Sequence, residues 1–171
     1  YTPDTITHLR IEATITRGNY CRNHDLWMVS DCRQDSFEEG FDSHPWDRSS
    51  LNPWIIDSTV HNGGAYSIRS APIAGRQTSD IGLDVTLGAA DSIIFCAKAS
   101  SEKNYDKLLF YIDNERQMEL SGNTGWCRFA YSIGAGSHRL LWRYVKDDSD
   151  SQGSDCGWID DVQLPLAQWD A

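Results

Sequence analysis

Hydrophobic and polar residues alternate along most of the chain with a period of two residues, which is typical of strands and differs from the 3.6-residue period of a helix. The clearest case is residues 138–146, where Leu140, Trp142 and Tyr144 share one face. Because consecutive strand residues point to opposite faces, we expect Trp142 in the core. The pattern predicts strands over residues 9–15, 36–41, 65–70, 82–87, 92–99, 108–113, 127–133, 138–146 and 157–165.

Turn-forming residues separate these segments, and no stretch longer than a turn or two has the pattern of an amphipathic helix. The turn signals are Asn62-Gly63-Gly64, Gly88, Asp113-Asn114, Ser121-Gly122-Asn123 and Gly134-Ala135-Gly136. Many short strands in one chain of 171 residues predict an all-β fold, an antiparallel β-sandwich of the jelly-roll type, as a single domain over 1–171. The first 35 residues are the least regular, and we expect added strands or the remnant of a preceding segment there.

Charge excludes some classes of partner. The formal net charge is −10, and no basic stripe is available for nucleic acid. No run approaches the roughly 20 apolar residues of a membrane helix, so membrane insertion is not expected. An acidic surface suits a secreted protein, a cation binder or a binder of neutral ligands. No signal peptide is visible at Tyr1, so the sequence predicts that one has been removed or that this is an excised fragment.

The five cysteines leave two alternatives open. Cys21 and Cys32 bracket a short segment that a disulfide could close, whereas Cys96 and Cys127 lie on separate predicted strands. The odd count leaves one thiol over. In an oxidising compartment one or two disulfides are expected, and the sequence does not determine their pairing. The alternative is free, buried thiols. No C-x-x-C pair is present, so a zinc cluster is not expected.

The segment KDDSDSQGSDCGWIDDVQLP, residues 146–165, is rich in aspartate. Asp148, Asp150 and Gly153 imitate the start of an EF-hand loop, but Ile159 stands where the bidentate acid is required. We therefore interpret residues 147–155 as a polar loop between two strands, solvated and weakly attractive to cations.

Asp160 and Asp161 differ because they lie inside a predicted strand. At least one of them should point toward buried surroundings, since neighbouring strand residues face opposite sides. A buried carboxylate needs a hydrogen-bond donor, a basic side chain or a metal ion as its partner.

A set of short motifs occurs in an order that resembles a known group of modules. The sharpest are SFEEGF (36–41) near the start and GWIDDVQLP (157–165) at the end. The order resembles the cleaved-adhesin and MAM-like group of β-jelly-roll modules of bacterial surface and secreted proteins, which is similar to carbohydrate-binding modules. The resemblance covers residues 36–165. It implies a non-enzymatic module, often fused to hydrolases or peptidases and frequently carrying a structural calcium ion.

Carried over to this sequence, the resemblance nominates Glu38 and Asp161 as calcium ligands, with Glu39 and Asp160 as their neighbours. The turn at Asn62 is the expected donor of carbonyl oxygens. The alternative is that these acids accept backbone hydrogen bonds at strand ends, with no metal.

Aromatic and polar side chains suggest a glycan as the ligand, because sugar rings stack on aromatic planes and their hydroxyls need hydrogen-bond partners. Trp46 and Trp126 stand beside turn residues and are expected to be exposed, while Tyr111, Asp113 and Arg143 are expected to face outward. The predicted function is a non-catalytic, calcium-stabilised carbohydrate-binding module of a secreted or cell-surface protein.

Two other functions stay open. The first is a protein–protein adhesion module, for which a flat apolar patch would be evidence in place of exposed aromatic rings. The second is a small hydrolase or lyase, which would require a cleft with converging titratable groups. His44, His61 and His138 are each expected to be surface or hydrogen-bonded residues rather than general bases.

Overall fold

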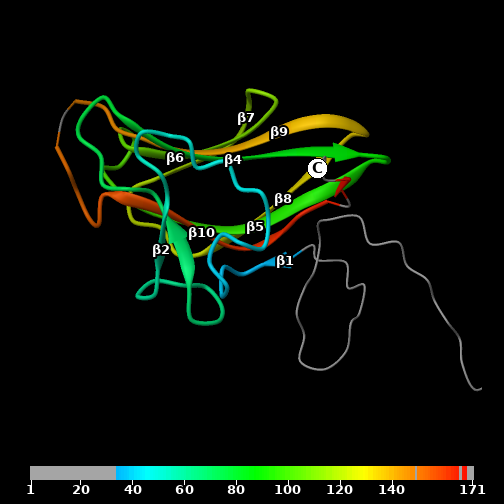
Figure 1. The fold of residues 1–171 in the computed structure, drawn as a ribbon. Helices are drawn as coiled ribbons and strands as arrows, with labels where there is room; N and C mark the ends of the chain where they lie inside the picture. The colour runs from blue at the N-terminus through cyan, green and yellow to red at the C-terminus, as the bar shows by residue number, and fades with distance from the viewer. Residues whose placement is uncertain (1–33, 149, 166, 169–171) are drawn as a thin grey trace, which may run out of the picture.

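The computed structural model describes residues 34–148, 150–165 and 167–168. These residues form two antiparallel sheets stacked face to face (Figure 1). The six-stranded sheet has the order β2–β3–β10–β5–β8, with β1 paired to β10. Its strands are β1 (Gln34–Asp35), β2 (Ile55–Asp57), β3 (Ser67–Arg69), β5 (Asp91–Ser100), β8 (Cys127–Ile133) and β10 (Cys156–Gln163).

The five-stranded sheet has the order β11–β4–β9–β6–β7. Its strands are β4 (Thr78–Leu87), β6 (Lys107–Ile112), β7 (Glu115–Ser121), β9 (Gly136–Val145) and β11 (Ala167–Gln168). The predicted antiparallel β-sandwich is therefore confirmed. No helix in the described part of the chain is long and apolar enough to cross a membrane.

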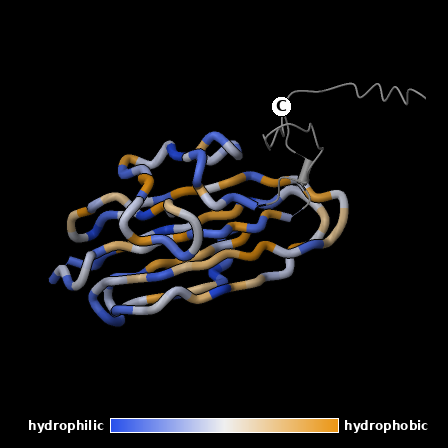
Figure 2. Tube along the Cα trace, turned by 90° about the horizontal axis from the view of Figure 1, so that it is seen from below, coloured by the Kyte–Doolittle hydropathy of each residue, from blue (hydrophilic) through white to orange (hydrophobic). Residues whose placement is uncertain are grey.

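The core lies between the sheets and is built from the inward-facing half of each alternating strand. Apolar and polar stretches follow one another along the strands in Figure 2. Phe95 of β5, Phe110 of β6 and Trp142 of β9 are fully buried. Their ring centroids lie 4.7–5.3 Å apart, a spacing at which aromatic pairs add to the stability gained by burial.

The strand predictions hold for the described segments with one exception. Residues 36–41 form a turn, which follows the two-residue strand β1. The carboxylate of Asp35 accepts the backbone N–H of Phe37, and Phe37 has a φ of 57°, so the chain bends where an extended strand was predicted. Residues 9–15 lie outside the described part of the chain. Strand β7 was not predicted, because most of its side chains are polar and it forms one edge of its sheet.

The prediction that Trp46 is exposed is wrong. Its side chain is only 8% exposed, and its indole Nε1 donates to Asp35 Oδ2 at 2.8 Å. The ring packs against Phe37 and Trp142, with both centroid distances 5.7 Å. The buried carboxylate of Asp35 also contacts His44 Nδ1 at 3.1 Å. Trp46 therefore closes the core and cannot stack on a ligand.

Candidate functional site

Four of the residues considered for calcium, Glu38, Asn62, Asp160 and Asp161, meet at the loop that follows β2, here called the Asn62–Tyr66 loop. Asp160 Oδ2 accepts the backbone N–H groups of Asn62 at 2.7 Å and Gly63 at 3.2 Å. Asp161 Oδ2 accepts Asn62 Nδ2 at 2.7 Å. Glu38 Oε1 accepts the backbone N–H groups of Ala65 and Tyr66, at 2.9 and 3.1 Å. The acids of β10 and of the turn after β1 thus hold one loop between them.

A β-bulge in β10 explains why two consecutive aspartates reach the same loop. The register with β5 shifts between Asp160 and Gln163, and Asp161 has a φ of 48°. A bulge redirects side chains that would otherwise alternate across the sheet. Asp160 is fully buried, and Asp161 is half-buried. Burial raises the pKa of Asp160, although three backbone N–H groups oppose that shift.

The oxygen atoms beside this loop could supply some of the ligands that a calcium ion requires. Among the described residues, Glu38 Oε2 and Asp161 Oδ1 accept no hydrogen bond. Gly63 and Gly64 leave the space that both carboxylates use: a Cβ at Gly63 would lie 3.3 Å from the Asp161 oxygens, and one at Gly64 would collide with Glu38. The two carboxylates could therefore each offer one oxygen, with backbone carbonyls or water completing the set. Asp160 is committed to the loop amides, and Glu39 is exposed.

The aspartate-rich segment after β9 divides into several local structures. Lys146 is buried and pairs with Asp155, which also accepts Tyr144 Oη at 3.0 Å. Asp148 pairs with Arg76 at the surface. The flanking elements are strands, so the segment is not an EF-hand.

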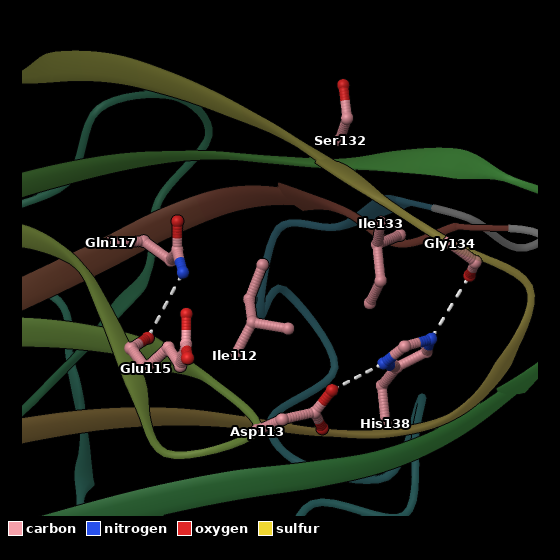
Figure 3. A pocket seen from close by; sticks show the side chains of 8 residues that line it. All are labelled: Ile112, Asp113, Glu115, Gln117, Ser132, Ile133, Gly134 and His138. Carbon is pink, nitrogen blue, oxygen red and sulfur yellow. Dashed lines mark hydrogen bonds and ion pairs between the residues drawn. The ribbon is translucent and has the colours of Figure 1, made fainter.

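The second candidate site is a pocket of about 350 Å³ between the β6–β7 turn and the β8–β9 turn. Asp113 Oδ2 lies 2.6 Å from His138 Nδ1, and Asp113 Oδ1 accepts the Arg139 backbone N–H at 2.8 Å. His138 Nε2 lies 3.1 Å from the carbonyl oxygen of Gly134 (Figure 3). The lining residues are Ile112, Asp113, Glu115, Gln117, Ser132, Ile133, Gly134 and His138.

The β6–β7 turn positions Asp113 in this pocket. Asp113 and Asn114 both have positive φ, 52° and 69°, as a two-residue type I′ hairpin turn requires. Burial alone would raise the pKa of Asp113, but hydrogen bonds from His138 and from the Arg139 backbone outweigh burial and lower it. The carboxylate is therefore a fixed, charged acceptor.

The other predicted ligand-binding residues do not join this pocket. Tyr111 and Arg143 lie on the outer face of β6 and β9, since Tyr111 pairs with Leu141 and Leu109 with Arg143. Arg143 makes a two-pronged ion pair with Asp80, at 2.8 and 2.6 Å. That pair raises the pKa of Arg143. Trp126 is half-buried in the connection between β7 and β8.

Sequence reasoning did not identify Glu115, Gln117 and Ser132 as pocket residues. They come from β7 and β8, which belong to different sheets, and the stacking of the two sheets brings them to one place. The turn signals at Asp113-Asn114 and Gly134-Ala135-Gly136 were the available clue, because both turns border the pocket. His138 is hydrogen-bonded, as expected.

The described cysteines are free thiols, and their sulfur atoms form no disulfide with one another. Cys96 and Cys127 lie on paired strands, where Ala97 is the register partner of Cys127. Cys156 is buried, and burial raises the pKa of its thiol to about 11. Cys21 and Cys32 lie outside the described residues.

A two-sheet antiparallel sandwich of this kind has the architecture of a jelly roll. No family model matches the sequence, and a search of curated proteins found no match. Solved structures with a similar fold do exist, all at low sequence identity.

The CBM22-1 xylan-binding domain of Paenibacillus barcinonensis Xyn10C is 16% identical with a TM-score of 0.53, and the match covers 81% of this chain and 96% of that domain. The K3 cleaved adhesin domain of Lys-gingipain from Porphyromonas gingivalis is 11% identical with a TM-score of 0.52, covering 75% and 95%. The secreted serine protease VesC from Vibrio cholerae is 13% identical with a TM-score of 0.52. That match covers 71% of this chain but only 26% of VesC. The resemblance to cleaved-adhesin and carbohydrate-binding modules is confirmed at the level of the fold.

Proposed function

We propose that this chain is a non-catalytic carbohydrate-binding module of a secreted or cell-surface protein, and that the pocket of Figure 3 receives a sugar residue. The observation that carries the proposal is the combination of a fixed Asp113–His138 pair with neighbouring polar groups that have no partner among the described residues. The clearest such group is the carboxylate of Glu115.

The pocket offers both kinds of contact that a sugar needs. Ile112 and Ile133 supply apolar surface for C–H groups, while Glu115 and Gln117 supply polar groups for hydroxyls. A pocket of about 350 Å³ lies within the usual size range of small-molecule sites. The xylan-binding domain with the same fold supports this choice of ligand class.

The arrangement of His138 favours binding over catalysis. Both ring nitrogens face oxygen acceptors, Asp113 on one side and the Gly134 carbonyl on the other. A general base needs a nitrogen that can take a proton from a nucleophile, and His138 has none free in this geometry. Its role here is to hold the two turns together.

An adhesion function has less support in the described structure. The large hydrophobic residues exposed there are Leu51, Tyr66 and Tyr105, and they lie in three different loops. A docking surface for another protein would require such residues to be contiguous.

Affinity electrophoresis in gels containing xylan or β-1,4-galactan tests the proposal. The wild-type chain is expected to be retarded by at least one polysaccharide. Gln117→Ala should weaken binding about tenfold, because a lost hydrogen bond contributes about 1–1.5 kcal/mol. Tyr111→Ala on the outer sheet face is the matched control and should bind as wild type. If Tyr111→Ala abolishes the retardation and Gln117→Ala does not, glycan binds at the outer sheet face and the proposed pocket is wrong.

The proposal includes a structural calcium ion held by Glu38 and Asp161, which would fix the Asn62–Tyr66 loop to β10. Calcium at 100 times its Kd would stabilise the fold by about 2.7 kcal/mol. Thermal unfolding in calcium should therefore occur roughly 5–10 °C above unfolding in EDTA. Asp161→Asn should lose most of that difference, while Glu39→Gln, on the exposed neighbour, should keep it. Equal midpoints with and without calcium in the wild type would remove the ion from the proposal.

A further inference from the structure

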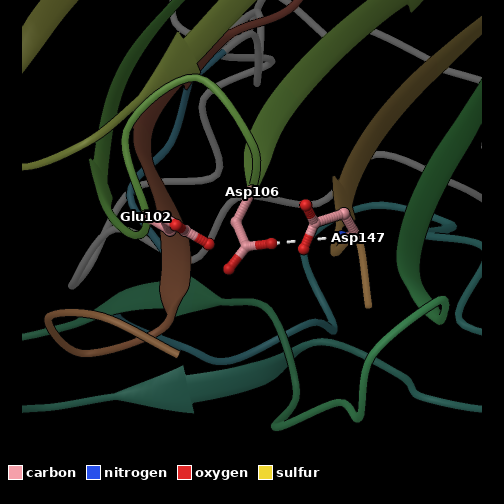
Figure 4. Close-up of side chains that lie close together, drawn as sticks. All are labelled: Glu102, Asp106 and Asp147. Carbon is pink, nitrogen blue, oxygen red and sulfur yellow. Dashed lines mark hydrogen bonds between the residues drawn. The ribbon is translucent and has the colours of Figure 1, made fainter. Parts of the chain in front are cut away.

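A second group of acids lies at the end of the sandwich where β5 leaves and β6 begins. Glu102, Asp106 and Asp147 each offer a carboxylate oxygen, and these oxygens all lie within 4.8 Å of one another. The first two come from the β5–β6 connection, and the third lies just beyond the end of β9, after Lys146. Figure 4 shows the carboxylate of Asp106 between the other two. Backbone hydrogen bonds from Tyr105 and Asp106 to the Glu102 carbonyl oxygen, at 3.4 and 3.2 Å, fold this connection tightly.

Asp106 supplies an independent reason to expect a ligand. Its side chain is 0% exposed, and Oδ1 accepts the Asp147 backbone N–H at 3.1 Å. Its other oxygen, Oδ2, is buried and has no hydrogen-bond partner among the described residues. Buried carboxylate oxygens are normally hydrogen-bonded, paired or bound to metal, because an unpaired one carries the full cost of desolvation.

The nearest cationic side chain does not meet this need. Lys146 Nζ forms a long ion pair with Asp106 Oδ2, at 3.7 Å, but that distance is beyond hydrogen bonding. The same ammonium group donates to Ser151 Oγ at 2.6 Å and pairs with Asp155. One ammonium group therefore faces two carboxylates, that of half-buried Asp155 and that of buried Asp106. Burial raises the pKa of Asp106.

We propose that Glu102, Asp106 and Asp147 bind a hard divalent cation of the calcium type. All three ligands are carboxylate oxygens, the donor class that such cations prefer. The cation would bring positive charge to Asp106 Oδ2, which accepts no hydrogen bond among the described residues. The ion would join the β5–β6 connection to the end of β9. The ion would also help to hold residues 74–77, because the carbonyl oxygen of its ligand Asp147 accepts the Arg76 backbone N–H at 2.7 Å.

This site is separate from the glycan pocket and from the Glu38–Asp161 pair. It gives a role to Asp147, the member of the aspartate-rich segment that faces the cluster, whereas Asp148 pairs with Arg76 and Asp155 with Lys146. The segment after β9 therefore contains one cation ligand and several ordinary ion pairs.

Isothermal titration calorimetry of the EDTA-stripped full chain with CaCl₂ tests the inference. Glu102→Gln and Asp106→Asn should each weaken one calcium-binding event at least tenfold, while Asp161→Asn should leave that event unchanged. Calcium binding that is lost only with Asp161→Asn would overturn this second site and leave the proposed Glu38–Asp161 site intact. The reverse pattern would support this site and remove the other.

Thermal unfolding of the same variants separates a cation ligand from a partner of Lys146. In EDTA, Asp106→Asn should unfold at or above the wild-type midpoint, because it removes a buried charge and keeps an acceptor for the Asp147 N–H. In calcium it should unfold below the wild type. If Asp106→Asn lowers the midpoint equally in both conditions, Asp106 serves only to pair with Lys146 and the inference is wrong.

Discussion

Replacing Trp142 by alanine is expected to lower the free energy of unfolding by about 3–5 kcal/mol, the range for truncating a large buried aromatic residue. The side chain is 0% exposed and contacts aromatic rings from both sheets and from the segment before β2. The alanine change would leave a cavity beside Phe95 and Phe110 and remove the ring on which Trp46 packs. Urea denaturation followed by far-ultraviolet circular dichroism measures the change.

Two further variants make this result specific. Trp142 Nε1 is buried without a hydrogen-bond partner among the described residues. Trp142→Phe removes that unsatisfied donor together with some volume, so it should cost much less than the alanine change, about 1 kcal/mol. Leu51→Ala, at a 99% exposed position, should change stability by less than about 0.5 kcal/mol. A loss with Trp142→Ala no larger than with Leu51→Ala would contradict the assigned core.

Replacing Asp160 by alanine is expected to lower the free energy of unfolding by about 2–4 kcal/mol when measured in EDTA. Its carboxylate accepts the backbone N–H groups of Asn62, Gly63 and Asp161, at 2.7, 3.2 and 2.7 Å. Each donor left without a partner costs about 1–3 kcal/mol where it is buried, and less where water can reach the exposed loop. Loss of the buried charge offsets part of this cost.

Asp160→Asn should give an intermediate loss, since its carbonyl oxygen can still accept the two loop N–H groups while its amide faces the Asp161 N–H. Glu39→Ala, which removes an exposed acid from the turn after β1, should be close to neutral. EDTA keeps any bound calcium out of the comparison. An Asp160→Ala protein as stable as Glu39→Ala would show that the carboxylate does not hold the loop.

The sequence predicted the sandwich well because the long strands bury one face against the other sheet. Leu140, Trp142 and Tyr144 occupy alternate positions and are all fully buried. The burial of Trp46 could not be predicted from alternation, because it depends on the carboxylate of Asp35, eleven residues earlier. That carboxylate accepts the indole N–H of Trp46 and the backbone N–H of Phe37, where the chain bends. Turn residues beside a tryptophan indicate that the chain bends there. They carry no information about whether other side chains cover that tryptophan.

The sites were predictable to different degrees. Glu38, Asn62 and Asp161 were nominated through a family resemblance, and the structure places them around one loop. The bulge that turns Asp161 toward Asn62 has no signal in the pattern, because period-two alternation assumes an unbroken ladder. The pocket at Asp113 is lined by residues from four strands of both sheets, β6, β7, β8 and β9. Such a juxtaposition depends on register and on the stacking of the sheets, which alternation leaves undetermined.

The central claim is that the pocket between the β6–β7 and β8–β9 turns binds glycan. Two-dimensional ¹⁵N–¹H correlation spectra, recorded as the labelled chain is titrated with xylo-oligosaccharides or β-1,4-galactotriose, test it most directly. We predict that the perturbed amides gather at residues 112–117 and 132–138. Perturbations confined to Leu141–Arg143 and their neighbours on the outer sheet face, or spectra that no glycan changes, would contradict the claim.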